Sequence, residues 1–312
     1  MNRVEIAKLN RIMIVYNRNS GKQLFASMIA RVNQIFKGVR ALSGCPRQVL
    51  IRDVYKFADL DNVAFEVVAQ QTDWVIIAGG DGTIRALIEK ILNLGYRPYF
   101  SIFPAGTVNL VARELQASKE PLKWLKRISK GVVGEIYTGR ANGHLFLTVA
   151  GIGYDSLIVD SVSETSKKLL NKFAYVWQGA EMLRKELLRQ NWRYHFRVRC
   201  DDEPEWQDAS TLLVCKSRYY AGRYMLFEHA SLCNPYFNVA VFTGCKSADF
   251  IRYSALLGLE ALGLDKTVCR RQARKLEIEC NVAEFPAELD GDVVTVAPLQ
   301  IEIDDVPLQF IM

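Results

Sequence analysis

The chain has 312 residues, of which 50% are hydrophobic and 24% charged, with a formal net charge of +6. This length and apolar content are sufficient for two domains with separate cores. No apolar run reaches the roughly 18 residues that a membrane-spanning helix needs, and the first residues lack the apolar centre of a signal peptide. We therefore predict a cytoplasmic protein.

Charge and cysteine usage narrow the classes of partner. Seven cysteines, an odd number with no CxxC pair, indicate reduced thiols and no metal or disulfide framework. Basic residues are interspersed with acidic ones, and the chain has no zinc-finger spacing, RNP-type strand or long basic arm. We therefore expect peripheral contact with an anionic membrane surface and no nucleic acid. The sequence leaves open whether the chain forms a homodimer.

Strand-like and helix-like segments alternate through the first 139 residues. Such alternation predicts a parallel sheet with ligands at the carboxyl ends of its strands. The predicted strands are 11–16, 48–52, 74–78 and 99–103, and the predicted helices are 23–36, 59–69 and 83–94.

Short alternating strands dominate residues 140–312, which predicts a β-sandwich. We therefore predict an α/β domain over residues 1–139 and a β-rich domain over 140–312, with the option that the final residues return to the first domain. The basic helix expected at 166–189 is either a solvated face or a membrane-docking face. The other predicted elements are strands at 146–149, 192–200, 211–216, 237–242, 275–280 and 293–296 and a helix at 248–264.

The segment Gly79-Gly80-Asp81-Gly82-Thr83 lies between a predicted strand and a predicted helix. Its three glycines allow the backbone to turn sharply and to approach a ligand closely, and the helix that follows directs N–H groups at an anion. Asp81 adds a carboxylate that can hold Mg²⁺. Taken alone, the segment is equally compatible with a plain glycine turn.

Two further polar loops follow predicted strands, at residues 17–22 (NRNSGK) and 104–109 (PAGTVN). A parallel sheet places all three loops at one edge. Asn17 and Asn109 are also compatible with ordinary turn chemistry. Together, however, the three loops predict a nucleotide site at this edge.

These loops, with the extended motif PAGTVNLVAR at 104–113 and DGD at 290–292, resemble the diacylglycerol kinase-type lipid kinases. That family includes soluble bacterial diacylglycerol kinases and the sphingosine and ceramide kinases. The resemblance implies an ATP-binding α/β domain related to phosphofructokinase and NAD kinases, followed by a β-sandwich domain that holds the lipid. It also implies ATP- and Mg²⁺-dependent transfer of the γ-phosphoryl group to a lipid hydroxyl, with diacylglycerol as the default acceptor and phosphatidate as the product.

The resemblance also implies roles for individual residues. Asp292 is the implied general base, and Asp81 and Asp290 are the implied metal-related carboxylates. From the residues alone, Asp290-Gly291 is also a favoured hairpin turn. The implied nucleotide-binding residues are Asn17, Ser20, Gly21, Gly79, Gly80, Asp81, Gly82, Thr83, Gly106, Thr107 and Asn109.

The chain departs from the family pattern at three places. Asp292 replaces the usual glutamate, and Arg85-Ala86 replaces Asn-Glu after the glycine motif. Asn234-Pro235 stands where the family has an Asp-Gly pair associated with a structural Mg²⁺, which argues against that metal because an amide is a poor replacement for a carboxylate. These departures leave open a catalytically weakened lipid- or nucleotide-binding protein. An NAD kinase is a second alternative, because that class shares the GGDGT loop and a two-domain plan.

Overall fold

The computed structural model describes residues 2–20, 25–42, 48–153, 196–220, 224–280 and 285–312. The chain divides into two compact units. Unit 1 comprises Met1–Tyr137 and Val306–Met312, and unit 2 comprises Thr138–Asp305. None of the helices in the described ranges has the length and apolar character needed to cross a membrane.

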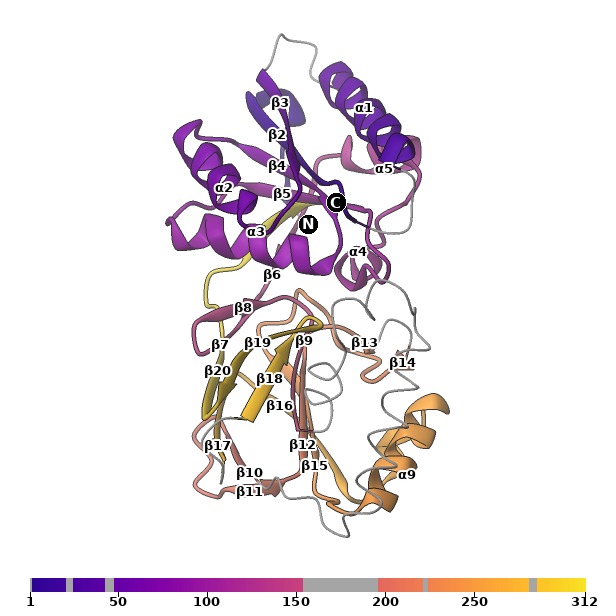
Figure 1. Cartoon of the computed structure of the whole chain (residues 1–312), viewed down its shortest axis with the longest axis vertical. Coiled ribbons are helices and arrows are strands. Elements are labelled where there is room, and N and C mark those ends of the chain that lie inside the picture. The colour runs from indigo at the N-terminus through magenta and orange to yellow at the C-terminus, as the bar shows by residue number, and fades with distance from the viewer. Residues whose placement is uncertain (1, 21–24, 43–47, 154–195, 221–223, 281–284) are drawn as a thin grey trace. The chain divides into compact units, whose positions relative to one another are not determined.

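Unit 1 is built on a seven-stranded sheet (Figure 1). Strands β2 to β5 are parallel, and β21 runs parallel to β5 and antiparallel to β6. The four strands predicted for this half are confirmed as β2 to β5; the near-continuous apolar runs of β2, β4 and β5 suit strands covered on both faces. The strand order is β1 (Asn2–Arg3), β6 (Val132–Ile136), β21 (Leu308–Ile311), β5 (Tyr99–Pro104), β4 (Trp74–Gly79), β2 (Arg11–Asn17) and β3 (Gln48–Val54).

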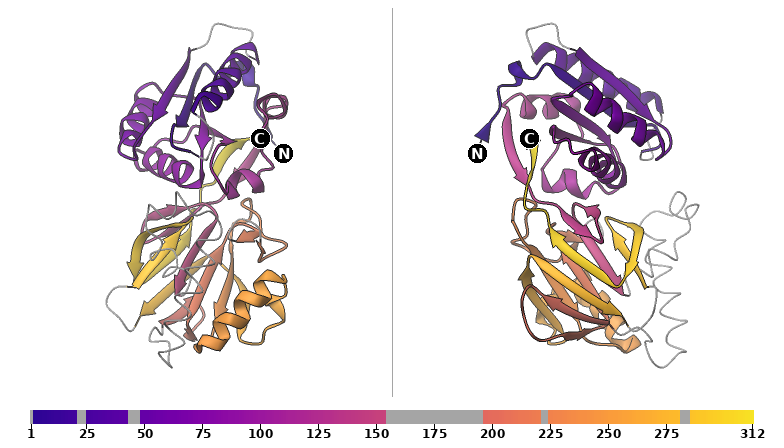
Figure 2. Two further views of the ribbon diagram at one scale, coloured as in Figure 1. Left: turned by 45° about the vertical axis from the view of Figure 1, so that its right-hand side comes forward. Right: turned by 90° about the vertical axis from the view of Figure 1, so that its left-hand side faces the viewer.

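Helices cover both faces of this sheet (Figures 1 and 2), with α1 and α5 on one face and α2 and α3 on the other. Trp124 of α5 joins its helix to the sheet, since its Nε1 donates to the Ile102 carbonyl at 2.8 Å and its ring packs edge-on against Phe103. The helical elements are η1 (Ile6–Lys8), α1 (Phe25–Leu42), α2 (Asp59–Ala69), α3 (Asp81–Asn93), α4 (Leu110–Glu114) and α5 (Pro121–Ile128).

Unit 2 contains two six-stranded antiparallel sheets, which confirms the predicted β-rich architecture. Phe146 of one sheet stacks on Phe237 of the other, with ring centroids 5.5 Å apart. The first sheet has the order β11 (Gln207–Ala209), β10 (Phe196–Cys200), β17 (Lys275–Cys280), β20 (Leu299–Ile303), β7 (Gly139–Ala141) and β8 (His144–Phe146). The second has the order β16 (Val268–Ala273), β15 (Phe237–Phe242), β12 (Thr211–Cys215), β9 (Val149–Gly153), β18 (Phe285–Leu289) and β19 (Asp292–Ala297), and β13 (Tyr219–Tyr220) pairs with β14 (Tyr224–Met225).

Two predicted elements of this half are wrong in their limits. The strand expected at 146–149 is a corner, because β8 ends at Phe146, β9 begins at Val149 and the residues between them bind the Asp290 carboxylate. The helix expected at 248–264 is α9 (Ser247–Gly258) followed by η2 (Leu262–Leu264). Between them the backbone turns left-handed at Glu260, with φ of 55°. The helix expected at 166–189 lies outside the described residues.

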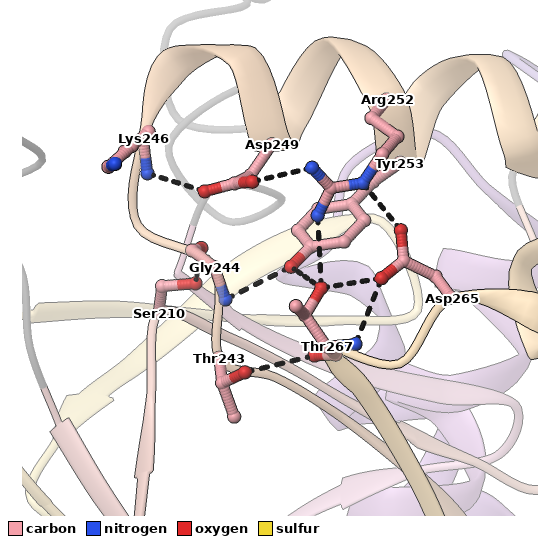
Figure 3. A network of polar contacts seen from close by, with 9 residues as sticks. All are labelled: Ser210, Thr243, Gly244, Lys246, Asp249, Arg252, Tyr253, Asp265 and Thr267. Carbon is pink, nitrogen blue, oxygen red and sulfur yellow. Dashed lines mark hydrogen bonds and ion pairs between the residues drawn. The ribbon is translucent and has the colours of Figure 1, made fainter.

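A polar network attaches α9 to the residues that precede β16 (Figure 3). The Arg252 guanidinium donates to Asp249 at 2.7 Å and to Asp265 at 2.6 Å. The Tyr253 hydroxyl lies 2.7 Å from the Thr267 hydroxyl, which also donates to Asp265. Although burial raises the pKa of Asp265, hydrogen bonds from Thr267 and Arg252 outweigh it and lower that pKa below its usual value. The network therefore binds an ionised Asp265.

Candidate functional site

The loops that carry the predicted nucleotide-binding residues leave the sheet of unit 1 at one edge. In the strand register Tyr16 of β2 pairs with Ala78 of β4, and Gly79 of β4 pairs with Pro104 of β5. The carboxyl ends of these three parallel strands are therefore adjacent. The structure thus brings together loops that are far apart in the sequence.

The loops after β4 and β5 are in backbone contact at two glycines. A Cβ atom on Gly106 would lie only 2.5 Å from the Gly80 Cα, and one on Gly80 would lie 3.3 Å from the Gly106 Cα. The Ala105 N–H donates to the Gly79 carbonyl at 3.1 Å. Because the clash of a Cβ on Gly106 is with backbone, the loops can approach this closely only where residue 106 has no side chain, and the fit at Gly80 is tight as well.

Asn17 links the loop after β2 to the first turn of α3. Its Nδ2 donates to the Thr83 hydroxyl at 2.8 Å, and its Oδ1 accepts the Asn19 N–H at 2.8 Å. The Ser20 N–H donates to the Asn17 carbonyl at 3.2 Å. Thr83 is only 4% exposed, so the Asn17–Thr83 bond is shielded from water. Gly21 lies outside the described residues.

Asn109 shapes the loop after β5. It has a left-handed φ of 57°, and its side-chain amide bonds both the N–H and the carbonyl of Gly106, at 2.7 and 2.6 Å. These contacts match the turn chemistry of asparagine. Asn109 therefore fixes the loop that carries the exposed residues Thr107 and Val108.

Asp81 joins the start of α3 to the start of α4. Its two carboxylate oxygens accept the N–H groups of Leu110 and Val111, at 3.0 and 3.1 Å. A carboxylate satisfies N–H groups that a helix leaves without an intrahelical acceptor, and it favours the positive end of the helix dipole. Asp81 therefore holds the two glycine loops together from one side.

The remaining accessible groups of these loops suit an anion. Gly80 and Gly82 are only partly buried, and they flank the first residue of α3. The first N–H groups of an α-helix point out of its end and favour phosphate. Thr107 adds a hydroxyl. The loop pair thus forms a small cradle of backbone N–H groups whose chemistry is compatible with an anion.

Arg85 introduces a buried positive charge one turn behind this cradle. Its side chain is 7% exposed and lies 3.4 Å from Glu89, whose side chain is 16% exposed. Asp81, Arg85 and Glu89 have the i, i+4 spacing that aligns side chains on one face of a helix. Arg85, which departs from the family pattern, therefore forms a largely buried ion pair with Glu89 within α3.

The DGD motif of unit 2 forms the hairpin between β18 and β19. Asp290 and Gly291 both have positive φ, of 53° and 93°, as a type I′ turn requires. The Asp290 carboxylate accepts the N–H groups of Leu147 and Thr148, both at 2.7 Å. The hairpin is thereby tied to the corner before β9. Asp292 is partly buried at the start of β19.

Two charged residues of unit 2 are buried although the sequence gives no role to either. Glu288 is 5% exposed and accepts the Gly291 N–H, so it braces the hairpin turn. Lys216 is 0% exposed at the end of β12. The only sequence signal for either is a charge adjoining a strongly apolar run, and such charges usually lie at the surface.

The described parts of the chain contain no group of three or more His, Cys, Asp or Glu residues placed to hold a metal ion. Mg²⁺ at a nucleotide site needs only one or two carboxylates from the protein, because phosphate oxygens and water complete its shell. Asp81 beside the glycine loops fits this role. Mg²⁺ binding by Asp81 and Asp290 stays a prediction.

The fold of this chain is similar to that of solved diacylglycerol kinase structures. A crystal structure of a diacylglycerol kinase from Bacillus anthracis superimposes with a TM-score of 0.75 at 21% identity, covering 97% of each chain. The diacylglycerol kinase of Bacillus subtilis is 27% identical over 286 residues, 91% of this chain and 90% of the relative. That of Staphylococcus saprophyticus is 28% identical over 231 residues, 74% of this chain and 72% of the relative.

Residues 11–141 match the family model described as Diacylglycerol kinase catalytic domain. This span contains β2 to β5 and the three loops at their carboxyl ends. Over these residues the chain therefore matches the diacylglycerol kinase catalytic domain family, and bacterial diacylglycerol kinases align with most of its length.

Proposed function

We propose that this protein is an ATP- and Mg²⁺-dependent lipid kinase that phosphorylates the free hydroxyl of diacylglycerol to give phosphatidate. The observation that carries the proposal is the loop pair at the ends of β4 and β5, where Gly80 and Gly106 touch at the start of α3. The relatives that align with most of the chain are named diacylglycerol kinases, a name that implies ATP and a lipid substrate.

In this proposal the loop pair holds the phosphates of ATP. Backbone N–H groups of Gly80 and Gly82 and the Thr107 hydroxyl bind phosphate oxygens, while the Asn17–Thr83 bond keeps the first turn of α3 in place. Mg²⁺ held by Asp81 would supply positive charge to neutralise the phosphates. Catalysis of phosphoryl transfer depends mainly on such positioning and charge stabilisation.

The proposed role of Asp292 is to accept the proton of the lipid hydroxyl. The hydroxyl oxygen forms a bond to the γ-phosphorus, the bond from that phosphorus to the bridging oxygen breaks, and ADP leaves. A base must sit within hydrogen-bond reach of the proton it accepts. Two carboxylates fix the hairpin that carries Asp292. Glu288 accepts the N–H of Gly291 within the turn, and Asp290 accepts the N–H of Leu147 in the corner before β9.

The proposed substrate also sets where the protein works. Diacylglycerol resides in membranes, so we propose a cytoplasmic protein that contacts an anionic membrane surface peripherally, with the excess of basic residues contributing attraction.

The test is incubation of the purified chain with γ-labelled ATP, Mg²⁺ and diacylglycerol in mixed micelles, with a total lipid extract in parallel. Asp292→Ala is compared with Asp292→Glu and with Asp202→Ala, an exposed control in the same unit. We expect labelled phosphatidate from the wild type and the control, and a loss of about 10²-fold or more in Asp292→Ala. ATP binding without any labelled lipid would establish a nucleotide-binding protein that lacks kinase activity, and would refute the proposal.

A further inference from the structure

Lys216 places a fully buried amino group against a single turn of unit 2. The side chain is 0% exposed, and its Nζ donates to the carbonyl oxygens of Asn234 and Tyr236, the latter at 3.1 Å. The Arg274 guanidinium donates to the carbonyl of the intervening Pro235 at 2.6 Å. Three successive carbonyl oxygens are therefore held by two basic side chains.

Such a cluster of backbone carbonyls is a typical partner of a cation. The same turn contains Asn234-Pro235, where the resemblance leads one to expect an Asp-Gly pair and a structural Mg²⁺. The residues present do not fit that metal. Neither Asn234 nor Pro235 has a carboxylate, and the carbonyls already face Lys216 and Arg274, which would repel a divalent cation.

Lys216 is also connected to the hairpin of Asp292 through one residue. Its backbone N–H donates to the Thr148 carbonyl at 2.7 Å. Thr148 is 0% exposed, and its N–H donates to the Asp290 carboxylate at 2.7 Å. Asp290 lies two residues before Asp292, in the turn of the hairpin. A displacement of the chain at Lys216 is therefore transmitted to the proposed base.

We propose that the Lys216 amino group replaces a divalent cation as the organiser of the 234–236 turn, and that it thereby positions the Asp292 hairpin. The amino group suits this role because it keeps at least two N–H donors in either protonation state, enough for both carbonyls. The pKa of Lys216 is lowered to about 7, mainly by burial; the charge of Arg274 contributes to the lowering and Cys233 opposes it. The turn is then independent of metal.

The first test is thermal unfolding without nucleotide, in EDTA and in millimolar Mg²⁺. Lys216→Met keeps most of the volume but leaves two carbonyls unsatisfied, so we expect its Tm to fall by roughly 5 °C or more in both solutions. The control Lys266→Met removes an exposed lysine of the same unit and should match the wild type. Two results would overturn the proposal. One is an unchanged Tm in Lys216→Met. The other is a fall in Tm on addition of EDTA that occurs in the wild type and equally in Asp81→Ala.

The second test, of positioning, rests on the proposed kinase activity. We expect Lys216→Met to lower kcat about 10-fold or more while KM for ATP stays within about twofold, because the proposed ATP-binding residues all belong to unit 1. Lys216→Arg, which keeps N–H donors, should recover part of kcat. Equal losses in Lys216→Met and Lys216→Arg, or a rise in KM for ATP alone, would refute positioning. If the wild type labels no lipid, the kinase proposal fails while the Tm comparison still decides the role of the lysine.

Discussion

Gly106 has no room for a side chain, because the Gly80 backbone occupies the position where a Cβ would be. We predict that Gly106→Ala separates the two loops and weakens ATP binding about 10-fold or more, since a displacement near 1 Å is costly at a site built from backbone. Calorimetric titration with ATP measures this. Gly258→Ala is the matched control, as no heavy atom lies within 4 Å of its Cβ position. ATP affinity equal to that of the control would show that the loop contact does not shape the nucleotide site.

Asp290 and Asp292 are two residues apart, and we predict that their substitutions separate stability from activity. Asp290→Ala leaves the N–H groups of Leu147 and Thr148 without their acceptor and should lower the free energy of unfolding by about 2–4 kcal/mol. Asp292→Ala should leave it within about 1 kcal/mol. Urea unfolding of both variants checks this. An Asp290→Ala variant as stable as the wild type would show that these hydrogen bonds do not hold the hairpin in place.

At the residue scale, the sequence identifies which loops are polar and glycine-rich, but it does not identify what their side chains bind. Asp81 bonds N–H groups 29 and 30 positions away, and Lys216 bonds carbonyls 18 and 20 positions away. Such partners are set by tertiary packing, whereas a motif reports only the local chain. The nucleotide-binding and catalytic roles of the motif residues stay predictions.

At the scale of elements, the attachment of α9 depends on Asp265, which binds both Arg252 and Thr267 (Figure 3). We predict that Asp265→Ala lowers the free energy of unfolding by about 1–3 kcal/mol, because it removes charged hydrogen bonds from a largely shielded carboxylate. Asp202→Ala, at an exposed position, should change it by less than about 0.5 kcal/mol. Equal stability of the two variants by urea unfolding would show that packing alone holds α9.

How well the sequence predicts an element depends on the type of sheet that contains it. Strands β2, β4 and β5 are buried runs bounded by loops, whereas β3 is a partly buried edge strand. Helix α2 begins and ends where its apolar spacing indicates. In unit 2, β7 and β11 have three residues each, too few to show an alternation. The sequence predicts a strand through Leu147 and Thr148, but both N–H groups bind the Asp290 carboxylate, which lies more than 140 positions away in the sequence.

At the scale of the whole molecule, Lys216 gives stability a pH dependence. Its pKa is about 7 in the folded chain against an ordinary 10.5, so the unfolded chain binds more protons between these values. We predict that the free energy of unfolding rises between pH 7 and 10, by at most about 1.4 kcal/mol per pH unit from this group. Lys216→Met should show a flatter profile in urea unfolding across this window. Parallel profiles would show that the lysine titrates normally.

Phe310 lies on β21, which follows unit 2 in the sequence, and it packs in the core of unit 1. It is 0% exposed, and its ring lies 5.6 Å from that of Phe100. We predict that Phe310→Ala lowers the free energy of unfolding by about 3–5 kcal/mol and weakens ATP binding, because β21 pairs with β5, the strand that leads into the Gly106 loop. Urea unfolding and ATP titration measure the two effects. Substitution of the half-buried Val4 by Ala is the milder control in the same unit.

The position of β21 also sets an order of events during synthesis. Unit 1 needs this strand between β5 and β6, but the ribosome makes it only after all of unit 2. Until then the nascent sheet has two unpaired strand edges facing the gap, and exposed edges of this kind invite association with other chains. The unit that begins first is therefore completed last, and a nascent chain halted within unit 2 carries an unfinished sheet in unit 1.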